Sequence, residues 1–398
     1  MDISRRTISP GISLTSINTN KFKTSALSVT LLSPLSRETV SLGAVLPPLL
    51  RRGSEILPDM TALARRLGSM YGAVLEPVSR KKGDLQAIGF YADFADPRYL
   101  PDSNSMLDEL FDLISSMLLH PLTEDGKLLA TYVAEEKWKL SDKLSARIND
   151  KRSFALRRLL QEMFPDSPYG IDPLGLPEYL SGITAESLTA YLKLLLSTAP
   201  IEFFYCGSSS PEEIAEKIAS SFGMLRPSFA PHPLRTEPAF PIPREPETIS
   251  TRMDVAQGQL TLGLRAGITA TDPEFPAAAV FNAVFGGTPS SKLFANVREK
   301  LSLCYYASSS YDELKGVCLV SSGIAFENFA TARDEILRQL DDCRENRISP
   351  EELSAAKSYL ISRLKSYPDS AGAMEDYCLN AAVSGCTESP EERAERIS

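Results

Sequence analysis

Alternating apolar and polar positions mark one strand in each half of the chain. Leu27, Val29 and Leu31 alternate with polar residues within ALSVTLLSP, and three leucines, 260, 262 and 264, alternate within QLTLGLRAG. A period of two places successive side chains on opposite faces of a strand. Both stretches therefore predict half-buried β-strands.

Each predicted strand is followed by the same series of elements. An apolar helical stretch comes first, SLGAVLPPLLRRG in one half and AAAVFNAVFGG in the other. A charged helix comes next, MTALARRLGSMYGA and SSKLFANVREKLSLCYYA respectively. Both halves then continue into a strand hairpin whose turn contains Lys-Gly, at Lys82-Gly83 and, 233 positions later, at Lys315-Gly316. This order-preserving match predicts a duplicated α+β domain.

Helical spacing dominates the remainder of each half. The first half has a long helical stretch from Glu124 towards Phe164, a helix that begins after the N-cap Thr184, and another with Pro211 at its first position. IEFFYCG, between the last two, is predicted to be a strand. The second half has FATARDEILRQLDDCREN and SPEELSAAKSYLISRLKS and stops within EERAERIS, with no strand to match IEFFYCG. The second domain is therefore either shorter or clipped at its end.

Seven prolines between Arg226 and Thr248 interrupt the periodic pattern. Such a segment is typical of an extended, semi-rigid connector. The predicted organisation is an N-terminal domain over 1–223, a proline-rich linker over 224–256 and a C-terminal domain over 257–398. The predicted fold class is α+β, with two homologous α/β-sandwich domains, each a mainly antiparallel sheet covered by helices.

Composition narrows the function classes. The net charge of −9 argues against a nucleic-acid partner. The basic runs Arg51-Arg52 and Arg80-Lys81-Lys82 are interpreted as solvated surface. No apolar run reaches the roughly 18–20 residues of a membrane span, and MDISRRTISPGISL lacks the features of a secretion signal. Six cysteines without CxxC spacing indicate free, mostly buried thiols. We expect a cytoplasmic protein with no membrane partner.

Histidine content excludes one class of metal site. The chain has two histidines, His120 and His232, each followed by proline. A zinc motif of the HExxH or HxxEH type needs two imidazoles one helical turn apart, so this chain cannot build one. Neither histidine lies near a GxSxG nucleophile signature, and both are interpreted as loop or capping residues.

The duplicated element order resembles the pitrilysin/insulinase family of zinc peptidases over essentially the whole chain. In active members of that family the first helix carries HxxEH, and a glutamate on a later helix completes the metal site. Alignment on Gly53 places Ala44, Pro47 and Pro48 at the His, Glu and His positions, and Glu136 at the distal glutamate. The resemblance therefore implies a degenerate site that holds no metal and has no peptidase activity alone. The proline pair is also incompatible with an ordinary helix interior.

The second half keeps a different family feature. Active members carry an Arg-x6-Tyr pair that contacts the substrate, and VREKLSLCYY provides Arg298 and Tyr305 at that spacing. A guanidinium can hold a peptide carbonyl, and a phenol can donate a hydrogen bond to a tetrahedral oxyanion. The resemblance implies that both residues bind substrate; the alternative is a helix arginine and a core tyrosine with structural roles.

A degenerate first half with a retained Arg/Tyr pair is similar to the non-catalytic subunits of two-subunit family members. The implied function is a subunit of a heterodimeric bacterial zinc metallopeptidase that binds peptide substrate, has no cofactor of its own and relies on an HxxEH-bearing partner for zinc. The alternative is a non-enzymatic homodimeric scaffold or peptide-binding chamber, because fold alone does not decide function.

Overall fold

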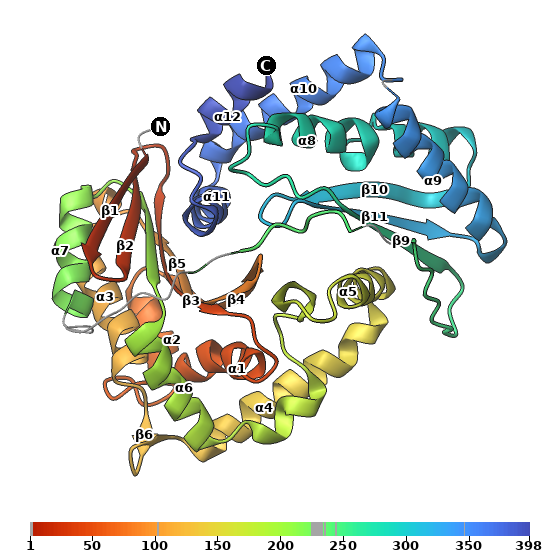
Figure 1. Ribbon diagram of the computed structural model, residues 1–398. Helices are drawn as coiled ribbons and strands as arrows, with labels where there is room; N and C mark the ends of the chain where they lie inside the picture. The colour runs from red at the N-terminus through yellow and green to blue at the C-terminus, as the bar shows by residue number, and fades with distance from the viewer. Residues whose placement is uncertain (1–2, 102, 224–233, 235, 243–244, 346) are drawn as a thin grey trace. The chain divides into compact units, whose positions relative to one another are not determined.

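The computed structural model describes residues 3–101, 103–223, 234, 236–242, 245–345 and 347–398. These residues form two compact units (Figure 1). The first consists of segments 1–146, 167–235 and 368–380, and the second of 147–166, 236–367 and 381–398. The boundary between 235 and 236 lies within the predicted proline-rich linker, of which 224–233, 235 and 243–244 are outside the described residues.

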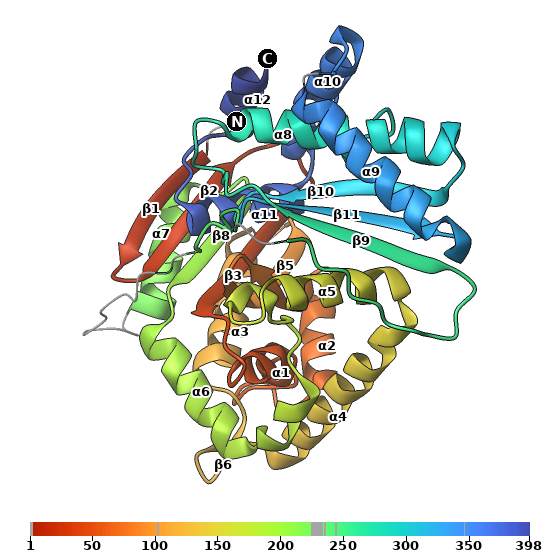
Figure 2. The ribbon, with the colours of Figure 1, turned by 45° about the vertical axis from the view of Figure 1, so that its right-hand side comes forward.

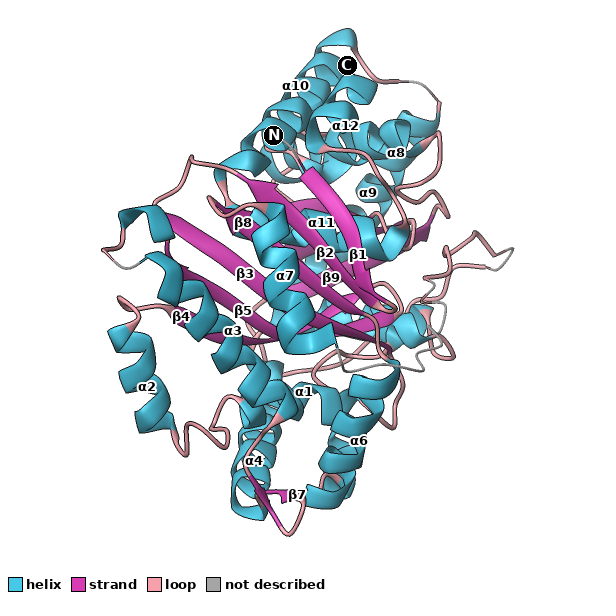
Figure 3. Cartoon of the chain, turned by 90° about the vertical axis from the view of Figure 1, so that its left-hand side faces the viewer, coloured by secondary structure: helices cyan, strands magenta, loops and turns pink. Residues whose placement is uncertain are grey.

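The first unit contains a six-stranded sheet in the order β1-β2-β8-β3-β5-β4 (Figure 3). Its neighbours are antiparallel except for the parallel pair β2/β8. The strands are β1 Ile3–Ser9, β2 Ile12–Asn18, β3 Thr24–Pro34, β4 Val74–Lys82, β5 Leu85–Ala95 and β8 Ile201–Gly207. The predicted strands at ALSVTLLSP and IEFFYCG are confirmed as β3 and β8, and the hairpin turn at Gly83 joins β4 to β5, where this glycine has φ +58°.

Helices cover one face of this sheet. Leu27, Val29 and Leu31 of β3 are buried against them in a single core, whereas Ser28 and Thr30 point to the opposite face. Figure 3 shows α3 and α7 in front of the strands. The helices of the unit are α1 Val40–Leu50, α2 Met60–Ser69, α3 Ser103–Leu119, α4 Ala130–Ala146, α6 Ala185–Thr198 and α7 Pro211–Phe222. The predicted starts of α6 and α7 are confirmed, with Thr184 in a capping box and Pro211 at the first position.

The second unit contains a three-stranded antiparallel sheet in the order β10-β11-β9. Its strands are β9 Gly258–Arg265, β10 Cys304–Asp312 and β11 Val317–Ile324, with the predicted Lys-Gly turn between the last two. Leu260, Phe285 and Ile336 are among the residues that form its main core. The α-helices are α5 Lys151–Met163, α8 Phe275–Asn282, α9 Phe329–Arg344, α10 Pro350–Ser366 and α12 Pro390–Ile397, and two π-helices are η6 Ala283–Gly287 and η7 Leu293–Lys300.

The duplication extends beyond the strands and hairpins. The series α4, η2 (Arg147–Asn149), α5 matches the series α10, η9 (Tyr367–Asp369), α11 (Ala371–Ser384), with first residues 220 positions apart in all three cases, from 130 to 350, 147 to 367 and 151 to 371. The last element of each series leaves its own half of the sequence: α5 belongs to the second unit, and residues 371–380 of α11 belong to the first. The two halves therefore exchange equivalent helices.

One predicted helix is wrong. The predicted long helix from Glu124 towards Phe164 is divided into the short hairpin β6/β7 (Thr123–Glu124 and Lys127–Leu128), α4 and α5. The hairpin turns at Asp125-Gly126, both at positive φ, and Asp150 starts α5 afresh by accepting a hydrogen bond from the Ser153 amide at 3.0 Å. A helical period alone does not show such breaks.

The basic runs are not solvated surface either. Arg80 and Lys82 pair with Glu375 and Asp376 of the exchanged segment, and Lys82 is buried. Lys81 donates to the backbone carbonyl of Tyr169 at 2.6 Å. Charge runs in the sequence therefore mark internal contacts between segments that are far apart in the chain.

Two further features bear on the class of protein. The six cysteines are free, and five of them are buried while Cys343 is half-buried, as the sequence predicts. Within the part of the chain that the structure describes, no helix is long and apolar enough to cross a membrane.

Asp96 joins three strand ends of the first sheet. This fully buried carboxylate, next to the end of β5, accepts hydrogen bonds from the Ser25 hydroxyl at 2.9 Å, from the Ser208 hydroxyl at 2.7 Å and from Arg98 Nε at 2.9 Å. Burial by itself would raise the pKa of Asp96, but the hydrogen bonds from Ser208, Arg98 and Ser25 outweigh it and hold the pKa below its ordinary value.

Replacing Asp96 by asparagine is expected to lower the free energy of unfolding by about 2–3 kcal/mol at neutral pH, because charge-assisted hydrogen bonds are lost. The folded-state pKa is depressed, so this contribution is complete above the unfolded pKa of about 3.9 and disappears as the pH falls through the folded value. Urea unfolding of both proteins between about pH 7 and pH 2 checks this. A difference that persists or grows on acidification contradicts the prediction.

Candidate functional site

The three positions assigned to the lost zinc motif lie on α1. Ala44 and Pro47 are buried and Pro48 is half-buried, and none has a side-chain nitrogen, oxygen or sulfur that could bind a metal. The helix continues to Leu50 despite the proline pair, which corrects the expectation from helix geometry. The prolines remove the two N–H groups that would bond the carbonyls of Gly43 and Ala44. The helix is held instead by its almost complete burial.

α1 also approaches the sheet very closely. Gln86 of β5 donates through Nε2 to the backbone carbonyl of Val40 at 2.9 Å and to that of Pro173 at 2.9 Å. A Cβ on Gly43 would lie 2.1 Å from Gln86 Oε1, so a larger residue at that point of the helix would displace the Gln86 amide. The helix that would present a metal motif is thus in place, but it carries no ligand.

Glu136 lies on α4, which packs against α1 (Figures 1 and 2). Its carboxylate Oε1 is 3.2 Å from Arg52 Nη1 and 2.7 Å from Lys139 Nζ. Arg52 Nη1 is also 2.5 Å from Glu135 Oε2, and its guanidinium lies 4.2 Å from the centre of the Tyr132 ring. The residual glutamate is therefore surrounded by cations of the protein itself.

Sequence reasoning missed Arg52, which it assigned to a solvated run. A signal for the burial of its partner is present in the sequence, because Glu136 stands at helical spacing between Val133 and Leu140, and all three are buried. A carboxylate on the apolar face of a helix requires a counter-ion. The sequence gives no indication of which cation supplies it, since Arg52 is 84 positions away.

No metal centre can be assembled elsewhere from the residues that the structure describes. No group of three or more His, Cys, Asp or Glu side chains in those ranges could hold an ion. His120 follows α3 with an exposed imidazole whose Nδ1 is 4.0 Å from Glu55 Oε2. His232 lies outside the described residues.

Arg298 and Tyr305 belong to the second unit. Arg298 is on η7, with its half-exposed guanidinium 4.6 Å from the centre of the Phe294 ring and Nε 3.6 Å from Glu299 Oε1. Tyr305, in β10, is 71% exposed. Tyr305 is therefore not a core residue, which was the alternative interpretation of this tyrosine. The assigned metal positions and this pair thus lie in different units.

Three backbone irregularities fall around this pair. Arg298 lies in a π-helix, Ser302 has φ +50°, and the register of β10 against β11 shifts between Cys304 and Tyr306. Tyr305 is the extra residue of that bulge. π-helical turns and β-bulges redirect side chains and are frequent at functional sites, where the rest of the fold stabilises the strain.

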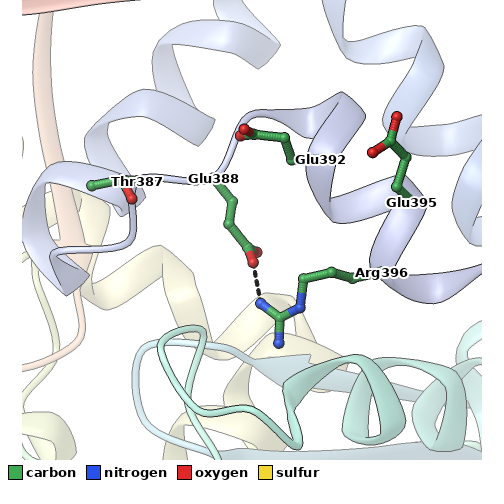
Figure 4. A pocket seen from close by; sticks show the side chains of 5 residues that line it. All are labelled: Thr387, Glu388, Glu392, Glu395 and Arg396. Atoms are coloured by element: carbon green, nitrogen blue, oxygen red, sulfur yellow. Dashed lines mark hydrogen bonds and ion pairs between the residues drawn. The ribbon is translucent and has the colours of Figure 1, made fainter.

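A surface depression of the second unit contains acidic residues but contributes nothing to this site. Thr387, Glu388, Glu392, Glu395 and Arg396 line it (Figure 4). The Arg396 guanidinium pairs with Glu388 and donates to the carbonyl of Pro273 at 3.2 Å. Glu392 accepts a hydrogen bond from the amide of Ser389 at 2.7 Å, as a helix cap. These side chains are therefore used to start and anchor α12.

Comparison with known proteins decides the family. A family model described as "Peptidase M16 inactive domain" matches residues 182–360. The "Probable inactive metalloprotease YmfF" of Bacillus subtilis (strain 168) is 30% identical over 380 residues, which cover 94% of this chain and 87% of that protein. The chain belongs to the M16 peptidase family. The predicted resemblance to the pitrilysin/insulinase family is thereby confirmed, including its YmfF-like, motif-lacking type.

Solved structures share the fold of this chain. A conserved protein from Enterococcus faecalis V583 has a TM-score of 0.89 and 30% identity, covering 100% of this chain and 93% of that one. A protease from Helicobacter pylori has a TM-score of 0.78 at 14% identity, covering 100% and 93% respectively, and shows the shared fold. The predicted α+β fold class is confirmed. This M16 chain is a metalloprotease-like protein of the inactive type.

Proposed function

We propose that this M16 chain is the non-catalytic subunit of a heterodimeric zinc endopeptidase of the bacterial cytoplasm. It presents Arg298 and Tyr305 to a peptide bound at the metal of an HxxEH-bearing partner. The free, mostly buried cysteines support a reducing compartment. The alternative homodimeric scaffold needs no exposed polar pair.

The observation that carries the proposal is the exposure of this pair on consecutive irregular segments. A tyrosine that served only packing would not be placed on a bulge with its ring largely in solvent. The phenol can donate to the oxyanion of a tetrahedral intermediate, and the guanidinium can hold a peptide carbonyl. Both groups act on a peptide that is bound at the metal ion of the partner subunit.

A strand edge beside Tyr305 suits an extended peptide. Among the described strands β10 forms an edge of its sheet, so its outer backbone groups can pair with an added strand. β4, one of the two edge strands of the first sheet, is less suitable: Pro77 has no N–H, and Arg51 Nε already donates to the carbonyl of Leu75 at 2.6 Å. We propose that peptide pairs with β10.

Co-purification from the native organism followed by zinc analysis tests the assembly. We expect the isolated chain to bind no zinc and cleave no peptide, and the complex to contain one zinc per heterodimer. Recovery of the chain only as a homodimer, without a motif-bearing partner, would replace the proposal with the scaffold.

A further inference from the structure

Glu136 presents an energetic problem that the family's metal would otherwise solve. Its side chain is only 8% exposed. An ionised carboxylate is costly to bury unless a positive charge compensates it. The side chains of α1 at the assigned metal positions are apolar, so they leave that compensation to other residues.

Arg52 is the more buried of the two cations that pair with Glu136. Its side chain is 16% exposed, whereas the Lys139 side chain is largely in solvent, where its charge is screened. The guanidinium is fixed on three sides, by Glu136, by Glu135 and by the Tyr132 ring. Arg52 also follows the C-terminus of α1, where the helix dipole favours a cation. A planar, permanently charged group suits such a site better than lysine.

The same contacts exclude a metal. Arg52 and Lys139 both donate to Oε1 of Glu136, so an ion at this carboxylate would be left with Oε2. It would also lie beside a guanidinium that cannot lose its proton. The residues present therefore do not fit zinc, even as a residual site.

We propose that Arg52 takes over the electrostatic and architectural role of a metal ion in this unit. The guanidinium neutralises Glu136 and joins the end of α1 to α4, so that the unit folds without metal while keeping its carboxylate. This inference concerns the first unit alone and stands whether or not the chain has a catalytic partner.

The test compares Arg52→Met, Glu136→Gln and the double variant in urea unfolding followed by circular dichroism, in the presence of a chelator. Removing one partner of a buried pair costs about 3–5 kcal/mol, whereas removing both is often neutral. We expect Arg52→Met to lower the folding equilibrium constant by about 10²–10⁴-fold. The double variant should recover most of that loss. Lys139→Met, the exposed matched control, should change the constant less than about 10-fold.

Zinc titration provides a second readout. Added zinc should leave the unfolding midpoint of the wild-type chain unchanged. The proposal is overturned by an Arg52→Met variant within 10-fold of wild type, by a double variant no more stable than the single one, or by stabilisation of the wild type with zinc. If Arg52→Met does not fold at all, a folded double variant supports the proposal and an unfolded one contradicts it.

Discussion

Replacing Tyr305 by phenylalanine is expected to lower the turnover of the assembled heterodimer by roughly 10- to 1000-fold, the range for loss of an oxyanion donor. Arg298→Ala should lower turnover by a factor in the same range. The stability of the chain should hardly change, since the Tyr305 ring is mostly in solvent and keeps its apolar part in the variant. Steady-state kinetics of peptide cleavage by the reconstituted complex measures both effects.

The two variants should differ in kinetic form. A donor used only in the transition state lowers kcat, whereas a group that holds the bound peptide raises KM. We therefore expect Tyr305→Phe to act mainly on kcat and Arg298→Ala on both constants. Full activity of both variants in an otherwise intact complex would remove the pair from the mechanism.

The chain offers a close control for the arginine. Arg333 on α9 is also half-exposed, lies 5.8 Å from the centre of the Phe329 ring and pairs with the next residue, Asp334. Arg333→Ala thus removes a similar set of contacts from the same unit. Tyr359→Phe on α10 serves the same purpose for the phenol, since Tyr359 is also exposed. Neither control should alter turnover.

Glu375→Ala is expected to lower the free energy of unfolding of the first unit by about 3–5 kcal/mol, the cost of breaking a buried ion pair from one side. The Glu375 side chain is 3% exposed and receives two hydrogen bonds from Arg80, at 2.6 and 2.8 Å, and one from Ser28 at 3.2 Å. Its loss leaves the Arg80 guanidinium without its bidentate partner.

Hydrogen exchange localises this effect. Amides of residues 371–380 should lose protection in Glu375→Ala more than amides of β8, because the buried carboxylate is one of the links between that segment and the sheet. Glu212→Gln is the control: Glu212 pairs with Arg6 at 2.7 Å on the surface of the same unit, and its substitution should cost far less than that of Glu375. An equal loss in the free energy of unfolding for the two substitutions would show that the buried ion pair stabilises the unit no more than the surface pair does.

Local chemistry in the sequence predicted the elements whose signals are contained within a few residues. The N-cap Thr184, the proline that starts α7 and the Lys-Gly turns all have that form. The pairing of strands into a duplicated α+β fold followed from the order of such elements. The break between α4 and α5 was missed because Asp150 acts as a cap only when the chain turns there.

Charges were the least predictable feature of the candidate site. Arg52 and Arg80 stand in runs that are usual on a solvated surface, and their partners are 84 and 295 positions away. The Arg298 and Tyr305 spacing was visible in the sequence, but the π-helix and the bulge that expose the pair depend on the packing of η7 against β10. Sequence patterns report burial and period, and they do not report register shifts.

The exchange of helices sets the order in which the chain can mature during synthesis. Ser28 meets Glu375 across 347 positions, so the sheet of the first unit stays without its closing segment until residue 380 has left the ribosome. At 5–20 residues per second, this wait lasts roughly 20–70 s. After their own synthesis, Arg80 and Lys82 wait a further 295 and 294 positions for their acidic partners. The first half of the chain therefore cannot complete its folding as an independent domain, because the first unit waits for residues 368–380 to be synthesised.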